Sequence, residues 1–197
     1  MDSQLLRLDS AGRARLLPGL ADPASARHVD WDRLAAALAA VEDGAIDVVA
    51  DCGRLRAEHF PAAVVHRAAA VVLVTGSSLR AVRAATQAIA ELREREACLG
   101  MLGTLVIGPG EPYGEREIGE ALGVPSVGSL PRDPKAAAVL SDGAPAGRLF
   151  TQSPLLRAAR TVATRLVELA AAHESRLTPP PAPVAAPTTT FGGSRVR

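Results

Sequence analysis

One stretch of the sequence decides how the rest is interpreted: Ile46-Asp47-Val48-Val49-Ala50-Asp51-Cys52-Gly53. This apolar run ends in an acid, and a second apolar run, Ala70-Val71-Val72-Leu73-Val74-Thr75, follows it. Near-continuous apolar runs are typical of strands buried in a parallel sheet. A doubly wound sheet presents groups to its ligand at the carboxyl ends of its strands, and in P-loop enzymes an acid there holds magnesium. The sequence therefore predicts a strand that ends at Asp51, although an acid that merely caps a loop is an equally simple interpretation.

The loop that grips phosphate in such enzymes is absent from this sequence. Nothing matches G-x-x-x-x-G-K-[ST], and Lys135 is the only lysine among the 197 residues. Residues 108–114 are rich in glycine, but Pro109 and Pro112 remove two of the backbone N–H donors that a phosphate loop needs. We therefore expect this segment to be a turn between a strand and a helix.

The composition favours one α/β domain. With 48% hydrophobic and only 3% aromatic residues, the core must consist mainly of alanine, valine and leucine, which suits helices packed on a parallel sheet. A formal net charge of +1 gives no overall basic field, so we do not expect nucleic acid as a direct partner. No apolar run is long enough to span a membrane. Cys52 and Cys98 suggest reduced thiols, and hence the cytoplasm.

Strand and helix patterns alternate along the chain, as expected for a parallel sheet. Apolar runs predict strands at residues 71–74, 103–108 and 124–129, with a weaker one at 14–17. Helical spacing and capping residues predict helices at 31–41, 62–67, from Ser77 or Ser78 to about 96, at 115–122, and from Ser153-Pro154 onward. We assign residues 1–176 to the domain and residues 177–197, rich in proline and threonine, to a disordered tail.

Other chemistry finds little support in the sequence. A nucleophilic serine at Ser77 or Ser78 lacks a G-x-S-x-G context, so a helix cap explains it better. The histidines and cysteines have no metal-ligand spacing. Arg157, Arg160 and Arg165 are interpreted as a solvated helix face, although a row of this kind also suits phosphates or anionic lipid. An enzyme acting on a small molecule with a flavodoxin-like sheet is kept as a minor alternative.

Several segments, in this order, resemble the MinD/ParA superfamily of deviant P-loop ATPases. The resemblance is particularly to the actinobacterial MinD-like proteins related to CpaE, which are associated with pilus-type secretion ATPases. It covers most of the chain up to about residue 169. The segments that carry it are Leu16-Leu17-Pro18-Gly19-Leu20-Ala21-Asp22-Pro23, Asp47-Val48-Val49-Ala50-Asp51-Cys52-Gly53-Arg54-Leu55, Val71-Val72-Leu73-Val74-Thr75, Leu130-Pro131-Arg132-Asp133-Pro134, Leu140-Ser141-Asp142-Gly143, Gly147-Arg148-Leu149 and Ser153-Pro154-Leu155-Leu156-Arg157-Ala158-Ala159-Arg160.

The resemblance implies a site that binds ATP and magnesium. Asp51 would be the catalytic and metal-holding acid, and Gly53 would begin the switch loop. The adenine would be bordered by two segments, Gly108-Pro109 and Pro131-Arg132-Asp133. It also implies a parallel-sheet fold with helices on both faces, and a protein partner or a homodimer, with a secretion ATPase as one candidate.

The departures from the family pattern are also informative. The family's first strand, its phosphate loop with two lysines, the next helix and the second strand would lie upstream of residue 1, and Gly108 replaces the usual asparagine. We expect either the C-terminal portion of a longer ATPase or a degenerate relative, a pseudo-ATPase kept for binding. The missing strand would lie beside the Asp51 strand, so apolar edges should be exposed there.

The expected function is therefore the positioning of chromosomes, septa or pilus and secretion machinery, without ATP hydrolysis by this chain alone. The alternative is an adaptor that binds a protein partner independently of nucleotide.

Overall fold

The computed structural model describes residues 4–20, 22–41, 46–94, 100–110 and 112–177. Three predictions lie outside these residues: the disordered tail, the reduced state of Cys98, and the end of the third predicted helix at about residue 96.

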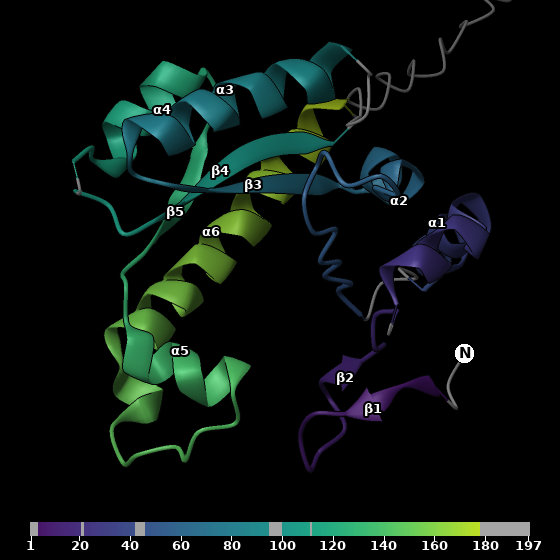
Figure 1. Ribbon diagram of the computed structural model, residues 1–197, viewed down its shortest axis with the longest axis horizontal. Helices are drawn as coiled ribbons and strands as arrows, with labels where there is room; N and C mark the ends of the chain where they lie inside the picture. The colour runs from purple at the N-terminus through teal and green to yellow at the C-terminus, as the bar shows by residue number, and fades with distance from the viewer. Residues whose placement is uncertain (1–3, 21, 42–45, 95–99, 111, 178–197) are drawn as a thin grey trace, which may run out of the picture.

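A parallel three-stranded sheet forms the centre of the fold (Figure 1). Its strands are β3 (Ala70–Gly76), β4 (Met101–Ile107) and β5 (Ser126–Leu130), in the order β3-β4-β5. The register pairs Ala70 with Met101 and Gly76 with Ile107 without a break, whereas the β4–β5 pairing shifts between Thr104 and Leu105. The three strands predicted from the apolar runs are confirmed, with β5 beginning two residues later than its run.

Helices cover both faces of this sheet, as predicted. Figure 1 shows α3 (Leu79–Glu94) and α4 (Glu115–Leu122) on one side and α6 (Pro154–Leu177) on the other. The core on the α3 side is tightly closed, because Ile118 is 1% exposed and Val106 is fully buried. On the opposite side, α6 packs on β5 and β4. The α/β architecture is therefore confirmed.

Capping residues set the helix ends where the sequence predicted them. Ser78 Oγ accepts a hydrogen bond from the Ala81 N–H at 3.3 Å and begins α3. Ser153 Oγ accepts from the Leu156 N–H at 3.3 Å and begins α6. Gly123 ends α4 with a φ of 61°, in the left-handed region that glycine adopts without steric strain.

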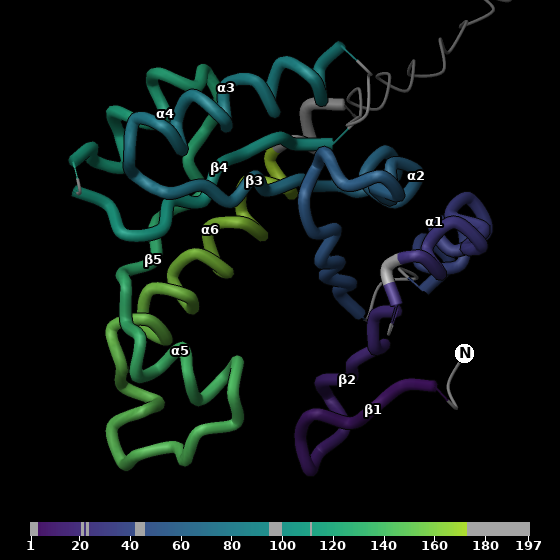
Figure 2. Tube along the Cα trace, in the orientation of Figure 1, coloured from purple at the N-terminus to yellow at the C-terminus, as the bar shows by residue number. Residues whose placement is uncertain are grey.

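The first 67 residues contribute smaller elements. A hairpin joins β1 (Leu6–Arg7) to β2 (Arg15–Leu16), and the 3-10 helix η2 (Pro23–His28) follows it. Helix α1 (Trp31–Ala39), capped by Asp30 as predicted, packs on α2 (Ala62–Arg67). Figure 2 shows the hairpin lying apart from the sheet. Its leucines, including Leu8, are exposed.

The predicted strand ending at Asp51 is wrong for this structure. Residues 46–53 have no assigned secondary structure, and Val49 is 94% exposed. A strand requires hydrogen bonds from a neighbouring strand, and among the described residues β3 pairs only with β4. The chain turns instead, because the Gly53 N–H donates to Asp51 Oδ1 at 2.9 Å. The apolar edges expected near this segment are indeed exposed.

None of the helices within the described ranges is long and apolar enough to cross a membrane.

Candidate functional site

The parallel sheet brings three loops to one edge. β3, β4 and β5 end at Gly76, Ile107 and Leu130, and all three point the same way. The residues that follow them, Ser77, Gly108 and Pro131, must therefore meet at the carboxyl edge of the sheet, where open α/β sheets bind ligands.

Two hydrogen bonds tie these loops together. Ser77 Oγ donates to the Gly108 carbonyl oxygen at 2.6 Å, and Ser77 is only 2% exposed. The Gly108 N–H donates to the Leu130 carbonyl oxygen at 2.8 Å. Gly108 is thus held from both neighbouring strands, and the edge has a fixed shape.

Arg132 lies directly against Gly108. A Cβ atom at position 108 would be 2.7 Å from Arg132 Nε, closer than real contacts allow, and Gly108 also has a φ of +65°. The positive φ favours glycine, and a Cβ atom here would require the exposed Arg132 side chain to shift. The family's asparagine could not replace Gly108 unless Arg132 moved.

The other predicted residues at this edge have structural roles that are visible in their hydrogen bonds. Asp133 Oδ1 accepts from the Ala136 N–H at 3.1 Å and caps α5 (Pro134–Ser141). The Gly110 N–H donates to the Tyr113 carbonyl oxygen at 2.8 Å, so the segment with Pro109 is a turn, as expected. Pro131 is half-buried, whereas Pro109 and Arg132 are exposed and available to a ligand.

The structure does not bring Asp51 and Gly53 to this edge. The residues beside them, Cys52 and Leu55, pack in one cluster with Val71 and Leu102. These are the second residues of β3 and β4, at the amino ends of the strands. Burial raises the pKa of the Cys52 thiol, and the nearby Asp51 carboxylate raises it further.

Comparisons with known proteins were informative at the level of fold. No family model and no curated protein matches the sequence. The MinD cell division protein of Aquifex aeolicus is similar in structure, with a TM-score of 0.66 and 20% identity over 85% of this chain and 70% of that one. A ParA family ATPase from Chlorobium tepidum gives a TM-score of 0.60 and 18% identity over 84% and 67%. MinD of Pyrococcus horikoshii, solved with Mg-ADP, gives 0.57 and 20% over 81% and 65%.

This chain has a MinD/ParA-like fold. The resemblance seen in the sequence is confirmed at that level. The chain spans only 65–70% of the length of these three structures, so about a third of each has no counterpart in it.

Asp51, the predicted magnesium ligand, lies away from the carboxyl edge of the sheet in this MinD/ParA-like chain. Across the described residues, no group of three His, Cys, Asp or Glu side chains is placed to hold a metal ion. Asp51 is exposed, outside the sheet, and its Oδ1 already accepts from Gly53. At the carboxyl edge, Pro131 and Arg132 present an apolar ring and a planar cation.

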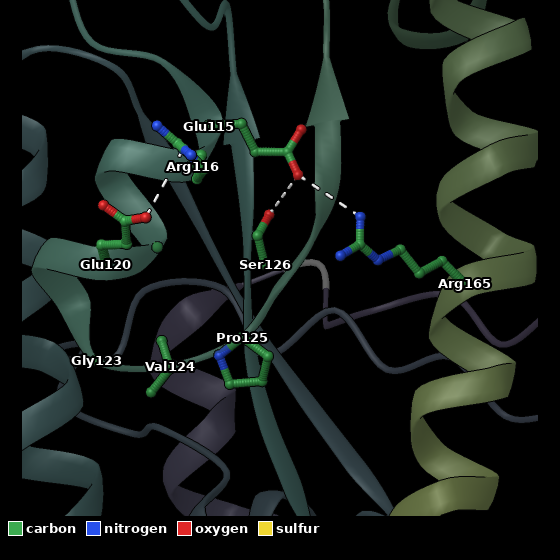
Figure 3. A pocket seen from close by; sticks show the side chains of 9 residues that line it. Glu115, Arg116, Glu120, Gly123, Val124, Pro125, Ser126 and Arg165 are labelled. Carbon is green, nitrogen blue, oxygen red and sulfur yellow. Dashed lines mark hydrogen bonds and ion pairs between the residues drawn. The ribbon is translucent and has the colours of Figure 1, made fainter.

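Sequence reasoning missed a hollow of about 710 Å³ between α4, the start of β5 and α6 (Figure 3). In it, Glu115 Oε1 accepts from Ser126 Oγ at 2.8 Å and lies 3.9 Å from Arg165 Nη1. Ser126 begins β5, so the hollow lies away from the carboxyl edge. No spacing in the sequence joins residues 115, 126 and 165. Their polar groups therefore pair with one another across α4, β5 and α6.

The two other arginines of the predicted row, Arg157 and Arg160, also bond within the chain. Arg157 Nη1 donates to the Gln152 carbonyl oxygen at 2.7 Å, and Arg160 Nη1 to that of Thr151 at 3.0 Å. Both acceptors belong to the 3-10 helix η3 (Phe150–Gln152). Arg157 and Arg160 therefore link the start of α6 to η3, which the solvated-face interpretation did not include.

Proposed function

We propose that this chain supplies the nucleotide-base side of a MinD/ParA-like ATPase that acts in cell division or chromosome partitioning. The observation that carries the proposal is the rigid carboxyl edge, where Gly108 is bonded from both sides and faces Arg132. This edge belongs to a fold shared with ParA and MinD structures.

The residues at the edge suit a flat, uncharged ring. An exposed guanidinium stacks on aromatic faces, and Arg132 has its aliphatic stem braced against Gly108. Pro109 and Pro131 add apolar surface without competing N–H donors. We therefore assign Gly108, Pro109, Pro131 and Arg132 to the adenine, with Asp133 positioning Arg132 by capping α5.

We further propose that the chain does not hydrolyse ATP by itself. Phosphoryl transfer depends on a phosphate loop and a lysine, and the sequence contains neither the motif nor any lysine except Lys135. Asp51 and Gly53 would serve as the magnesium-holding acid and switch glycine only where residues 46–51 form a strand of the sheet. In this proposal, ATP and magnesium are cofactors of a larger assembly.

A protein partner in the cytoplasm completes the proposal. One neighbour with this fold is the MinC:MinD cell division protein complex of Aquifex aeolicus, with a TM-score of 0.65 and 20% identity over 85% of this chain and 68% of that one. The resemblance noted in the sequence adds a pilus-type secretion ATPase as a second candidate partner. An adaptor that ignores nucleotide is favoured by a different observation, the exposed apolar edge of β3.

The experiment is isothermal titration calorimetry of the 197-residue protein with adenosine, ADP and ATP, each with magnesium. Because the base would make most of the contacts, adenosine and ADP should bind with Kd values within about threefold, a difference below about 1 kcal/mol. Arg132→Ala should weaken both about two- to fivefold through loss of the stacking contact. Lys135→Ala, an exposed cation three residues away, is the matched control and should change neither.

A Kd for ADP about a hundredfold lower than for adenosine would contradict the proposal, because it would require a phosphate grip worth about 2.7 kcal/mol. If none of the three ligands binds, the proposal is wrong and the adaptor function replaces it.

A further inference from the structure

Strand β5 contains one residue more than the part of β4 that it pairs with. The register pairs Thr104 with Ser126 but Leu105 with Gly128, so Val127 is the extra residue. An insertion of this kind is a β-bulge, which bends a strand and reorients the residues that follow it. Gly128 has a φ of +140°, a backbone conformation that residues with a side chain rarely adopt.

The bulge puts two consecutive residues on the same face of the sheet. Val106 packs in the core under α3, so Gly103, three residues earlier, faces α6. A Cβ atom on Gly103 would lie 2.8 Å from Val127 Cγ1, which places the Val127 side chain on that face. A Cβ atom on Gly128 would lie 2.7 Å from Val162 Cγ2 of α6. In a regular strand these two neighbours would point to opposite faces.

The bulge determines where Arg132 lies. Beyond it, Ile107 pairs with Leu130, and the Gly108 N–H donates to the Leu130 carbonyl oxygen at 2.8 Å. Without the extra residue, Ile107 would pair with Ser129, and every later residue would be displaced by one position, about 3.3 Å. A shift of one residue also moves each side chain to the other face of the sheet. Arg132 would then no longer lie against Gly108.

A polar network holds the bulge from outside the carboxyl edge. Ser126 Oγ accepts a hydrogen bond from the Gly128 N–H at 3.1 Å, across the extra residue, and donates to Glu115 Oε1 of α4 at 2.8 Å. Arg165 Nη1 of α6 lies 3.9 Å from the same carboxylate oxygen (Figure 3). A hydrogen bond to a carboxylate is stronger than one between neutral groups. A local bond from a serine to the backbone two residues on competes with regular strand pairing, so this network favours the bulged register.

We propose that Ser126 and Glu115 are positioning residues for the nucleotide base. They hold the bulge of β5, and the bulge places Arg132 against Gly108. The inference rests on the proposed function for the identity of the ligand, whereas the effect of the network on the register of β5 can be measured without any ligand.

The first test is amide hydrogen exchange of the 197-residue protein, followed by NMR. Two reporters are compared: the Gly108 N–H, which bonds across β4 and β5, and the Met101 N–H, which bonds to the residue before β3. Ser126→Ala should accelerate exchange of Gly108 at least about tenfold more than that of Met101, because only Gly108 depends on the register beyond the bulge. Ser129→Ala, at a half-buried serine of the same strand, is the matched control and should change neither.

Variants of Glu115 separate its role in the network from its role in α4. Glu115→Ala should loosen Gly108 as Ser126→Ala does, whereas Glu115→Gln keeps an acceptor oxygen for Ser126 and should restore most of the protection. Glu120→Ala removes an exposed carboxylate of the same helix, which pairs only with Arg116 on the surface, and should leave Gly108 unchanged. The far-ultraviolet circular dichroism spectrum establishes that each variant folds.

The second test is calorimetric titration with adenosine. Ser126→Ala should weaken binding about two- to fivefold, as Arg132→Ala does, and should add nothing in an Arg132→Ala background, because both changes remove the same contact.

Equal acceleration of Gly108 and Met101 in Ser126→Ala, or no acceleration, would overturn the inference, since the serine would then contribute only to general stability. So would wild-type adenosine affinity in Ser126→Ala. Selective loosening of Gly108 in a protein that binds no adenosine would support the role of the bulge and contradict only the proposed function.

Discussion

Residues 4–60 and residues 70–172 contain similar apolar sequences but bury them very differently. In the later region, Val106 and Val127 have no exposed surface. In the described residues up to 60, Ala35 is the only buried residue. The runs Val48-Val49 and Val71-Val72 have the same strand propensity, yet only the second has a paired neighbour. The difference teaches that strand formation here depends on the neighbouring strand rather than on the local sequence.

The largest expected contrast comes from truncating one apolar side chain in each region. Ile118→Ala should lower the free energy of unfolding by about 2–5 kcal/mol, because it leaves a cavity in the closed core. Leu8→Ala, at 62% exposure, should change it by less than about 0.5 kcal/mol. Urea unfolding followed by circular dichroism measures both values. Similar losses for the two variants would mean that the hairpin is packed as tightly as the sheet.

A smaller loss is expected at the carboxyl edge. Ser77→Ala leaves the buried Gly108 carbonyl without this donor and should cost about 1–3 kcal/mol in unfolding free energy. Ser25→Ala, at an exposed serine of η2, is the control and should be neutral. Adenosine binding should weaken with Ser77→Ala, since Gly108 positions Arg132. Wild-type stability in Ser77→Ala would show that the three loops are not held by this bond.

The sheet interior also contains a buried hydroxyl group, that of Thr104, whose removal should stabilise the protein. Thr104 is fully buried in β4, and its Oγ1 has no hydrogen-bond partner among the described residues. Thr104→Val should therefore raise the melting temperature, by an amount corresponding to about 1 kcal/mol. Thr75→Val is the matched change in β3 and should lower it, because Thr75 Oγ1 donates to the Ala81 carbonyl oxygen at 3.3 Å. Calorimetry measures both melting temperatures. This explanation would be refuted if the two variants changed the melting temperature in the same direction.

The smallest effect concerns the partly buried thiol of Cys52, which follows the exposed residues 46–51. The raised pKa of Cys52 leaves less thiolate at pH 8 than an ordinary cysteine has, so alkylation by iodoacetamide should be slow and should accelerate as the pH rises above 9. In a Cys98→Ser background, Asp51→Asn should speed the reaction at pH 8 by about twofold, because burial, the larger cause, remains. Mass spectrometry gives the rates. A rate at pH 8 equal to that of free cysteine would mean that residues near Asp51 are unpacked.

Most elements could be predicted because their signals are local. Ser153-Pro154 starts α6 and Gly123 ends α4 through residues only a few positions away. The family resemblance implied that Gly108 and Pro131 border one site, and the parallel β4–β5 pairing does bring them to the same edge. In contrast, the Ser77–Gly108 bond joins residues 31 positions apart, and the contact of Arg132 with Gly108 depends on the exact backbone path. The prediction of a strand ending at Asp51 was wrong for the same reason, because a strand also needs a neighbouring strand to pair with, and the local sequence does not indicate one.

The most direct test of this account is amide hydrogen exchange of the 197-residue protein followed by NMR. The account predicts slow exchange for Val106 and Val127, whose strands are paired and buried, and fast exchange for Val48, Val49 and Ala50. Val72 and Val74 should exchange faster than Val71 and Leu73, because their N–H groups face the free edge. Strong protection of Val48 to Ala50 would contradict the account, since it would place the Asp51 strand in the sheet and its carboxylate at the nucleotide edge.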